Sequence, residues 1–382
     1  MPRESTQSMR VSHVITGLND GGAEAVLFRL CNHDTLHQHF VISLTDEGKY
    51  GPLLASNGIE VQTCGMAPNR PSPLAFIKLV QLLRRQNPDV VQTWMYHADL
   101  VGGVAARIAG IKSIVWGIRH TTLEPGKSKK TTIWIAKLLA KLSRWLPSQI
   151  AVCARRAIDV HVSLGYDRAK MHYIPNGYDF SEFVPKPDEA LHLRAQLGVA
   201  NNIPLVGTVG RYDPQKDHAN LLRGLSILRN RSVSMRCLLV GTNLDEDNKA
   251  ILNQVYRLGL EKHVLLLGKR TDIPTVMSAL DLHILPSAYG EAFPNVVAEA
   301  MACETPCVVT DVGDAAHIVG DTGWVVPPRD AESLANAIQE ALLEKESGLW
   351  AERCRSARVR VQGEFDISKM VDAYHDLWRQ AL

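Results

Sequence analysis

Two glutamates, Glu291 and Glu299, lie eight residues apart in the otherwise apolar stretch GEAFPNVVAEAM. Pro294 disfavours a helical backbone at Phe293 and suits the first turn of a helix, which predicts a loop at Glu291 and a helix around Glu299. A carboxylate without a partner in such apolar surroundings would be costly, so we favour two functional glutamates over two incidental ones. Glu291 could then contact a sugar, and Glu299 could accept two hydrogen bonds from a ribose diol.

The start of this helix is also expected to bind oxygen atoms of a ligand. Backbone N–H groups at a helix N-terminus have no partner within the helix and lie at the positive end of its dipole. Phosphate or sugar oxygens could therefore be received there. The residues concerned are Phe293, Pro294, Asn295, Val296 and Val297.

A second candidate is the loop GRYDPQKDH (210–218), which follows a strand pattern and carries Arg211 and Lys216. Two cations at the entry to a helix could hold a diphosphate, because their charges and the helix dipole act in the same direction. A solvated loop without a ligand has equal weight as an alternative.

Two further candidates lie in the first half of the chain. His120 follows the strand pattern SIVWGI, at an edge where ligands bind in open α/β sheets, although a structural histidine remains an alternative. Gly21 and Gly22, in TGLNDGGAE, could let backbone N–H groups approach an anion. A plain turn is the more common meaning of such a pair, since GLNDGG lacks the GxGxxG fingerprint.

The elements that must position these residues follow an α/β pattern. Short β-branched runs alternate with helical segments, which predicts two doubly wound Rossmann-like domains on parallel sheets. We expect the first domain at 9–184 with the C-terminal helix 366–382, a linker rich in proline and charge at 185–202, and the second domain at 203–365. The predicted strands are 10–16, 39–44, 89–94, 113–118, 149–153 and 170–175, then 204–210, 235–241, 263–268, 282–287 and 307–311.

The bulk composition excludes several classes of protein. The formal net charge is only +2, so we expect no nucleic-acid partner. The seven cysteines are scattered without a pair at zinc-ligand spacing, which indicates reduced thiols. The N-terminal stretch MPRESTQSMR lacks the core of a signal peptide, and no apolar run reaches the roughly 18 residues of a membrane span, so we expect a cytoplasmic protein.

With these residues in view, the chain resembles the family 4 retaining glycosyltransferases of the GT-B type. The resemblance is carried by GGAEAVLFRL, IPNGYDFSEF, VGRYDPQKD, LPSAYGEAFPNVVAEAMACETPCVVTDVG and TGWVVPPRD. It implies two Rossmann-like domains that face a cleft. By position, Glu299 matches the glutamate that holds the nucleotide ribose and Glu291 the one beside the donor sugar. Arg211 and Lys216 match the pair that neutralises the leaving diphosphate, and His120 matches a histidine that contacts the donor sugar.

The same resemblance assigns four further positions and shows three departures. Gly21 and Gly22 match a glycine-rich loop that closes on the diphosphate, while Arg270 and Thr271, a weaker assignment, lie where the family contacts the base. The family commonly has glycine where this chain has Ala292 and Glu304, and a glycine-rich GxGP turn where this chain has GTNLDED. The methyl group of Ala292 narrows the loop beside the donor, which affects the identity of the sugar. Glu304 is expected at a surface turn.

The resemblance implies a retaining transferase that moves a sugar from a nucleoside diphosphate donor, expected to be UDP-linked, to a hydroxyl acceptor. We expect no cofactor and no metal, because the acidic triplet Asp245, Glu246 and Asp247 reads as the solvated cap of a helix. Two rivals share the architecture. One is a UDP-sugar 2-epimerase, which needs no acceptor, and the other is a non-catalytic sugar-nucleotide sensor.

The acceptor is expected to be a lipid-linked saccharide of surface polysaccharide synthesis, or another saccharide. Residues 127–146 carry basic residues on one helical face and apolar residues on another, with Trp134 and Trp145 near the ends. This predicts an interfacial helix on anionic lipid at the inner face of the cell membrane. A packing helix with a solvated basic face has equal weight. We expect WMYHAD (94–99) to form a wall of the acceptor site.

Overall fold

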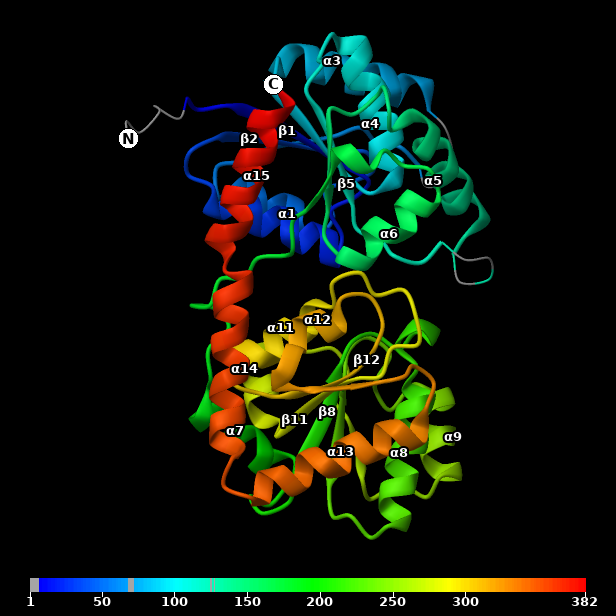
Figure 1. Cartoon of the computed structure of the whole chain (residues 1–382), viewed down its shortest axis with the longest axis vertical. Helices are drawn as coiled ribbons and strands as arrows, with labels where there is room; N and C mark the ends of the chain where they lie inside the picture. The colour runs from blue at the N-terminus through cyan, green and yellow to red at the C-terminus, as the bar shows by residue number, and fades with distance from the viewer. Residues whose placement is uncertain (1–6, 68–71, 124–125, 127) are drawn as a thin grey trace. The chain divides into compact units, whose positions relative to one another are not determined.

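The computed structural model describes residues 7–67, 72–123, 126 and 128–382. The chain divides into two compact units, each built on its own parallel sheet (Figure 1). Unit 1 comprises Met1–Gly177 and Ile367–Leu382, and unit 2 comprises Tyr178–Asp366. Helices and strands alternate in both, which confirms the predicted pair of Rossmann-like α/β domains.

Unit 1 contains a seven-stranded sheet in the order β3-β2-β1-β4-β5-β6-β7. All of its pairings are parallel, and the inner strands β4 and β5 are buried along their whole length, as expected of a sheet covered by helices on both faces. The strands are β1 (Arg10–Ile15), β2 (Gln38–Ser43), β3 (Glu60–Thr63), β4 (Val90–Trp94), β5 (Ile114–Ile118), β6 (Gln149–Val152) and β7 (Met171–Tyr173). The helices are α1 (Gly22–His33), α2 (Tyr50–Ser56), α3 (Pro73–Gln86), α4 (Tyr96–Ala109), α5 (Lys130–Leu142), α6 (Arg155–Ser163), η1 (Arg168–Lys170) and α15 (Ile367–Ala381).

Unit 2 contains a six-stranded parallel sheet in the order β10-β9-β8-β11-β12-β13. Its strands are β8 (Leu205–Val209), β9 (Arg236–Val240), β10 (Val264–Leu266), β11 (Leu282–Leu285), β12 (Cys307–Thr310) and β13 (Trp324–Val326). The helices are α7 (Pro187–Gln196), η2 (Pro214–Lys216), α8 (His218–Asn230), α9 (Lys249–Arg257), α10 (Ile273–Ala279), α11 (Asn295–Ala302), α12 (Ala315–Val319), η3 (Gly320–Thr322), α13 (Ala331–Glu346) and α14 (Trp350–Phe365).

Each sheet has one point where the order of its strands reverses. In unit 1 this point lies between β1 and β4, and in unit 2 it lies between β8 and β11. Loops that follow the strands on either side of such a point diverge and leave a crevice at the carboxyl edge, where open α/β sheets bind their ligands. The two switch points are therefore where candidate site residues should gather.

The predicted linker 185–202 is wrong as a free connection, because α7 lies within it and packs on α10 of unit 2. The anchor is Arg194, which is 7% exposed. Its guanidinium donates to the carbonyl oxygens of Ala279 and Ile203 and contacts Asp281 Oδ2 at 3.1 Å. Proline and charge in this segment thus belong to a packed helix. The chain passes from unit 1 to unit 2 at Gly177 and returns at Asp366.

The C-terminal helix α15 lies in unit 1, beside α1 (Figure 1). Its apolar stripe packs into the hydrophobic core of that unit, with Met370, Tyr374 and Trp378 almost fully buried. The indole of Trp378 donates from Nε1 to Gln92 Oε1, at 3.1 Å. The first and last segments of the sequence therefore share one core.

Candidate functional site

At the switch point of unit 2, the side chains of Lys216 and Glu291 form an ion pair. Lys216 ends η2 after β8, and Glu291 lies in the loop after β11. The Lys216 Nζ donates to Glu291 Oε1 at 2.7 Å, and Ser287 Oγ donates to the same oxygen, also at 2.7 Å. The two charged side chains are only 15% and 9% exposed. The structure thus brings together two residues that the sequence placed 75 positions apart.

The electrostatics of this pair keep the carboxylate ionised. Burial by itself raises the pKa of Glu291, but the Lys216 ammonium and hydrogen bonds from Ser287 and Gln215 more than offset it and hold the pKa below its usual value. Sequence reasoning missed Ser287 and Gln215. Ser287 is the last residue of the strand pattern LHILPS (282–287), and this place at the end of a strand is the signal that could have pointed to it.

The loop that holds Glu291 depends on two glycines with left-handed backbone. Gly290 has φ +80° and Gly313 has φ +60°. A side chain at Gly313 would place its Cβ 2.4 Å from the carbonyl oxygen of Glu291, and the N–H of Asp314 donates to the carbonyl of Ala292 at 2.9 Å. The turn after β12 therefore lies directly against the glutamate loop, and only glycine permits that approach.

Arg211 is not part of this buried pair. Its guanidinium contacts Asp213 Oδ2 at 3.2 Å, and its side chain is 60% exposed. The backbone of the loop is fixed, because the N–H groups of Gly210 and Tyr212 donate to carbonyls at the end of β9 and beyond. The structure thus places the Arg211 backbone at the carboxyl edge of the sheet and leaves its cation near the surface.

The helix predicted around Glu299 is α11, and it begins at Asn295 rather than at Pro294. Pro294 is the N-cap and offers no side-chain hydrogen bond, so the first turn has no side-chain cap. The N–H of Val297 donates to the Pro294 carbonyl at 3.1 Å and so already has a partner within the chain. Proline has no N–H, and neither residue is then a donor to a ligand. Glu299 lies on the second turn, partly buried.

Two aromatic residues and an amide support the start of α11. Phe293 is 6% exposed and packs against Phe365, with ring centroids 5.1 Å apart, and against Tyr178 at 6.4 Å. The hydroxyl of Tyr178 donates to Asn295 Oδ1 at 2.6 Å. The Phe293 side chain is therefore a packing residue, and any role for it toward a ligand belongs to its backbone.

The loop after β10 carries Arg270 and Thr271. The Arg270 guanidinium makes a bidentate ion pair with Asp272, with an Nε to Oδ1 distance of 2.8 Å. Thr271 is exposed. The cation of Arg270 is thus held by the residue that caps α10, and the loop would meet a ligand mainly through its backbone.

At the switch point of unit 1, a cavity of about 450 Å³ contains His120. It lies over the carboxyl ends of β1, β4 and β5, and Met95 in its wall has φ +71°, an unusual conformation for a side chain of that size. The imidazole of His120 lies with its Nε2 3.4 Å from Ser128 Oγ. The lining residues are Thr16, Met95, Tyr96, His97, Arg119, His120, Ser128, Lys129, Thr131 and Thr132.

Arg119 lines this cavity and was missed in the sequence, although it directly precedes His120. Its Nη1 donates to Asn176 Oδ1 at 2.6 Å, its Nη2 donates to the hydroxyl of Tyr374 on α15, and its Cζ lies 4.6 Å from the centroid of a Trp94 ring. The C-terminal helix therefore helps to hold a cation in the wall of the cavity.

The predicted acceptor wall, WMYHAD, is only partly correct. Trp94 and Asp99 are 0% and 1% exposed and belong to the core, while Tyr96 and His97 line the cavity. Burial raises the pKa of Asp99 to about 8, against the hydrogen bonds from Thr93 and Gly117, so this carboxyl is largely protonated at neutral pH. Strand residues of the segment point into the core because β4 is covered on both faces.

The glycine pair lies at the start of α1, with Gly21 as N-cap in an extended conformation, φ −144°. The carboxyl of Glu24 folds back over it, so that a Cβ at Gly21 would lie 2.3 Å from Glu24 Oε2. Burial, and to a smaller extent the charge of Asp20, raise the pKa of the Glu24 carboxyl, whereas a hydrogen bond from its own backbone N–H lowers it. An anion that approached Gly21 and Gly22 would have to compete with Glu24.

The acidic triplet that was expected to cap a helix lies just before it. The N-cap of α9 is Asn248, whose side chain accepts from the N–H groups of Ala250 and Ile251. Asp245 to Asp247 form the preceding turn, and the prediction of the cap was wrong by one residue. The amide oxygen of Asn248 caps the helix as a carboxylate would, but without a charge.

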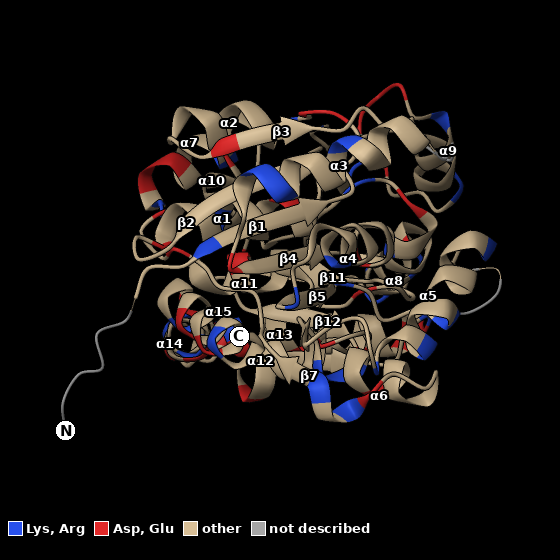
Figure 2. Ribbon diagram, turned by 90° about the horizontal axis from the view of Figure 1, so that it is seen from above, with Lys and Arg blue, Asp and Glu red and all other residues tan. Residues whose placement is uncertain are grey.

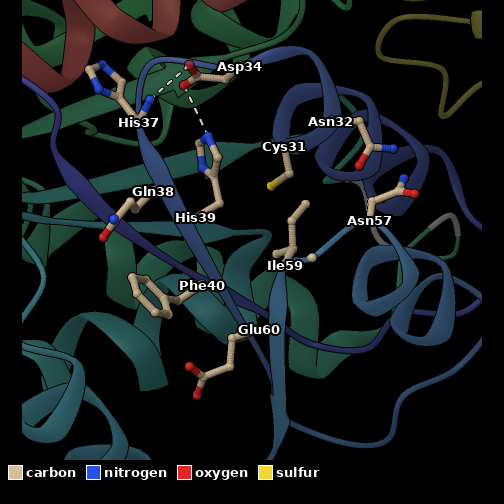
Figure 3. Close-up of a pocket in the computed structure, with 11 residues that line it drawn as sticks. Cys31, Asn32, Asp34, His37, Gln38, His39, Phe40, Asn57, Ile59 and Glu60 are labelled. Carbon is tan, nitrogen blue, oxygen red and sulfur yellow. Dashed lines mark hydrogen bonds and ion pairs between the residues drawn. The ribbon is translucent and has the colours of Figure 1, made fainter.

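A histidine cluster in unit 1, at the opposite edge of the sheet from the cavity, also escaped sequence reasoning (Figure 3). The Trp94 Nε1–H donates to His13 Nδ1 at 3.2 Å, so His13 carries its proton on Nε2 and donates to His39 Nδ1 at 2.9 Å. The Nε2 atoms of His39 and His375 then lie 3.1 and 2.8 Å from Asp34 Oδ2. The cluster thus joins α15 to the C-cap of α1 through close imidazole–carboxylate contacts to Asp34.

Comparisons with known proteins agree with the architecture. The family model described as Glycosyltransferase Family 4 matches residues 20–182, and the one described as Glycosyl transferases group 1 matches residues 203–344. A curated relative from Escherichia coli, UDP-Gal:alpha-D-GlcNAc-diphosphoundecaprenol alpha-1,3-galactosyltransferase, is 28% identical over 315 residues, which cover 80% of this chain and 78% of the relative. The putative glycosyltransferase EpsF of Bacillus subtilis is 27% identical, with 80% of each chain covered.

A solved structure shows the same fold. Anabaena Alr3699/HepE in complex with UDP and glucose has a TM-score of 0.83 and 26% identity, with 96% of this chain and 98% of that chain covered. The two matched family models fall on unit 1 and on unit 2 in chain order. The chain therefore belongs to the family 4 glycosyltransferases, and its units are the Rossmann-like domains of the GT-B fold.

Proposed function

We propose that this glycosyltransferase moves a sugar from a UDP-linked donor to a hydroxyl of a lipid-linked saccharide, with retention of anomeric configuration. The observation that carries the proposal is the buried Lys216–Glu291 pair at the switch point of unit 2. Support for the donor comes from the similar HepE structures with UDP and with UDP-glucose, and support for the acceptor from the name of the Escherichia coli relative.

In the proposed reaction the bond between the anomeric carbon and the diphosphate oxygen breaks, and the diphosphate leaves with the electron pair. The acceptor oxygen forms the new bond on the same face, and its proton passes to the departing phosphate oxygen. Lys216, Arg211 and the start of α11 would stabilise the charge that grows on the diphosphate, which is the electrostatic work such a transition state needs. Because these groups could supply the positive charge, we propose a metal-independent reaction.

Glu291 would position the donor sugar and not attack it. Its Oε1 already accepts hydrogen bonds from Lys216 and Ser287, which fixes the carboxylate and lowers its basicity. Glu299, one turn into α11, would accept hydrogen bonds from the ribose, and the Arg270–Thr271 loop would contact the base through its backbone. Gly21 and Gly22 would approach the diphosphate and His120 the sugar, both from unit 1.

The decisive test compares Arg211→Ala with Arg257→Ala, which removes an exposed arginine from α9. If Arg211 supplies ~3 kcal/mol to the transition state, its removal lowers turnover on the order of 10²-fold, while Arg257→Ala keeps wild-type turnover. Donors are screened as radiolabelled nucleotide sugars, with slow hydrolysis as the readout. Full turnover by Arg211→Ala, or activity that chelator abolishes and a divalent ion restores, would rule the mechanism out.

The same screen separates the epimerase alternative. An epimerase would convert the sugar nucleotide to an isomer in the absence of any acceptor, whereas a transferase would release UDP and free sugar slowly. Chromatography of the nucleotide sugar after incubation with the protein alone distinguishes the two.

Membrane attachment is proposed through α5, in a form that differs from the predicted interfacial helix. Ile135 and Leu139 are buried within unit 1, so the apolar face of the helix is not available to lipid. Trp134 and Trp145 remain 64% and 72% exposed. Figure 2 shows Lys and Arg residues on α5, and Lys127 falls outside the described residues.

A basic surface with exposed indoles would bind anionic headgroups without deep insertion. No helix among the described residues combines the length and apolar character needed to cross a bilayer. Flotation with phosphatidylglycerol vesicles tests the proposal, and a protein that stays unbound at low salt removes it.

A further inference from the structure

The cavity at the switch point of unit 1 has a one-sided charge. Arg119 and Lys129 line it together with the imidazoles of His97 and His120, and no Asp or Glu occurs among its described lining residues. Thr16, Ser128, Thr131 and Thr132 are also among the lining residues, and the hydroxyl of Ser128 already donates to the carbonyl of Thr122 at 2.6 Å. A wall of cations and hydroxyl donors is suited to an anion with several acceptor oxygens.

The cations of the wall are not neutralised by carboxylates within the described part of the chain. Arg119 donates to an amide oxygen and to a phenol hydroxyl and lies over an indole ring, and its Nε has no hydrogen-bond partner among the described residues. Asp99 is the buried carboxyl whose pKa responds to Arg119, and burial keeps it largely protonated at neutral pH. This contrasts with Lys216 in unit 2, which has Glu291 at 2.7 Å.

Two helices also begin at this cavity. The N-caps of α4 and α5 are Met95 and Lys129, and neither makes a side-chain capping hydrogen bond. Both caps, and residues of both first turns, are among the lining residues. Uncapped first turns offer N–H donors, and their dipoles add positive potential to that of the side chains.

We propose that this cavity binds a phosphate or diphosphate group of the acceptor. The inference rests on the proposed function, which assigns the diphosphate of the donor to unit 2 and to Gly21 and Gly22, residues that do not line this cavity. Of the lining residues only His120 is assigned to the donor, through its sugar, so an anion in the cavity would belong to the other substrate. A volume of about 450 Å³ is that of a small-molecule site and accommodates a diphosphate with an attached sugar. The phosphate belongs either to a lipid diphosphate or to a soluble sugar phosphate, which present the same oxygens to these side chains.

The first experiment uses inorganic pyrophosphate as the probe on protein saturated with UDP, so that the donor site is filled. Lys129→Gln is compared with Lys130→Gln, because both residues are exposed neighbours and only Lys129 lines the cavity. At constant ionic strength, calorimetry should show that Lys129→Gln weakens pyrophosphate binding about tenfold, the effect of one charge-assisted hydrogen bond, and that Lys130→Gln changes it less than about twofold.

Two results of this titration would overturn the inference. One is equal weakening by both variants, which would mean that pyrophosphate responds only to the general surface charge. The other is the absence of pyrophosphate binding once UDP is present. The exposed position of Lys129 and its lack of a capping hydrogen bond make misfolding of the variant an unlikely complication, and its thermal transition is recorded as a check.

The second experiment identifies the source of the phosphate with three water-soluble acceptors: a short-chain polyprenyl-diphosphate saccharide, a hexose phosphate and a neutral alkyl glycoside. For the true class, Lys129→Gln should raise the KM for the acceptor about tenfold and leave the KM for the donor unchanged. A neutral glycoside used as well as the phosphorylated acceptors, and insensitive to Lys129→Gln, would contradict the site.

The proposed function and the anion site can be tested separately. If pyrophosphate binding depends on Lys129 but no acceptor is glycosylated and no donor is hydrolysed, the proposed function is wrong and the anion site remains. If Arg211-dependent transfer is observed but Lys129→Gln affects neither pyrophosphate binding nor the KM of any acceptor, the anion site is wrong and the function remains.

Discussion

The switch points of the two sheets have the same topology but differ in charge. In unit 2, Lys216 and Glu291 are buried against one another, and the net charge of the pair is zero. In unit 1, Arg119 and Lys129 line a cavity without a carboxylate among its described residues. One sheet edge is thus compensated within the protein, and the other is left positive.

The difference in charge affects how each sheet edge can bind a ligand. A buried pair held by further hydrogen bonds cannot reorganise easily, so it offers fixed geometry. The pair adds little net charge of its own, and the proposed attraction to the donor diphosphate then rests on Arg211 and the start of α11 as well. An uncompensated group of cations attracts an anion strongly but depends on that ligand for its final order. We therefore assign placement of the reacting bond to unit 2 and capture of a phosphorylated group to unit 1.

The largest expected effect comes from breaking the pair in unit 2. Lys216→Met leaves Glu291 buried without its cation, and the free energy of unfolding should fall by about 3–5 kcal/mol, while Lys129→Met, at an exposed position, should change it by less than about 0.5 kcal/mol. Turnover of Lys216→Met should fall on the order of 10²-fold or more. Urea unfolding and single-turnover kinetics measure the two quantities.

A double variant separates stability from chemistry at the same position. Lys216→Met combined with Glu291→Leu removes both charges, so much of the lost stability should return, but turnover should not. Equal losses of stability in Lys216→Met and Lys129→Met would show that the two edges do not differ as described.

The next effect is a dependence of stability on pH that involves both edges. In unit 1, His161 accepts a hydrogen bond from the hydroxyl of Tyr96, and burial lowers the pKa of His161 to about 4. In unit 2, burial and the charge of Lys216 lower the pKa of His283, on β11, to about 3. Both are neutral in the folded protein near pH 5, where the unfolded chain, with histidine pKa values near 6.5, binds protons.

The contribution of these histidines to stability should therefore be fully present above about pH 6.5 and fall as the pH decreases toward 4, by up to about 3 kcal/mol for His161. The raised pKa of Asp99 has the opposite effect over this range, because the folded protein holds a proton that the unfolded chain releases. Urea unfolding at pH 7, 6 and 5 therefore compares the wild type with His161→Gln, in which the fall in stability with decreasing pH should be smaller. Equal slopes in the two proteins would contradict the assignment of a neutral buried His161.

A smaller effect concerns the link between α15 and the cavity. Tyr374→Phe removes the hydroxyl that accepts from Arg119, so about 1 kcal/mol of stability should be lost, and the affinity for pyrophosphate should change because the guanidinium is less well fixed. Trp378→Phe, which removes a hydrogen bond of the same helix to Gln92, is the matched control. It should cost stability without changing pyrophosphate affinity, and an equal change in both variants would make the role of Tyr374 purely structural.

Much of the fold follows from sequence because its signals are local. The inner strands have long β-branched runs and were predicted within a few residues. The edge strands β3 and β13, with four and three residues, were missed because they are short and mostly not buried, whereas the equally short β7 and β10 lie within longer predicted runs. Helix α7 was taken for a linker because it is polar around most of its surface and is held by Arg194, whose partners Ala279 and Asp281 lie more than 80 residues further along the chain.

The site was predictable where residue type and strand end coincide, as for Lys216, Glu291 and His120. The contacts of these side chains were not predictable, since the hydrogen bonds of Ser287 and Gln215 to Glu291 form only when the loops after β8 and β11 meet. The contact of Tyr374 with Arg119 likewise joins segments far apart in the sequence. The side-chain direction of Arg211 was equally out of reach, because an exposed ion pair with Asp213 competes with any inward position. Sequence therefore indicates which edges carry chemistry, and tertiary contacts decide how charge is balanced there.

The smallest expected effect lies at the far end of α11 and tests how local the compensated edge is. Glu304 has φ +62° where the family commonly has glycine, and the N–H of Thr305 donates to the Ala300 carbonyl across this turn at 3.0 Å. A left-handed backbone costs a non-glycine residue about 1–2 kcal/mol, and glycine loses part of that gain through the entropy of the unfolded chain, so Glu304→Gly should stabilise the protein by about 0.5–1 kcal/mol. Differential scanning calorimetry gives the shift, and turnover should remain unchanged, since only the N-terminal end of α11 is assigned to the donor.

Glu304→Ala, which removes the carboxylate but keeps a Cβ in the left-handed conformation, is the control and should not stabilise. A stabilised Glu304→Gly protein with altered turnover would mean that the whole helix, rather than its first turn, is coupled to the reacting end of unit 2.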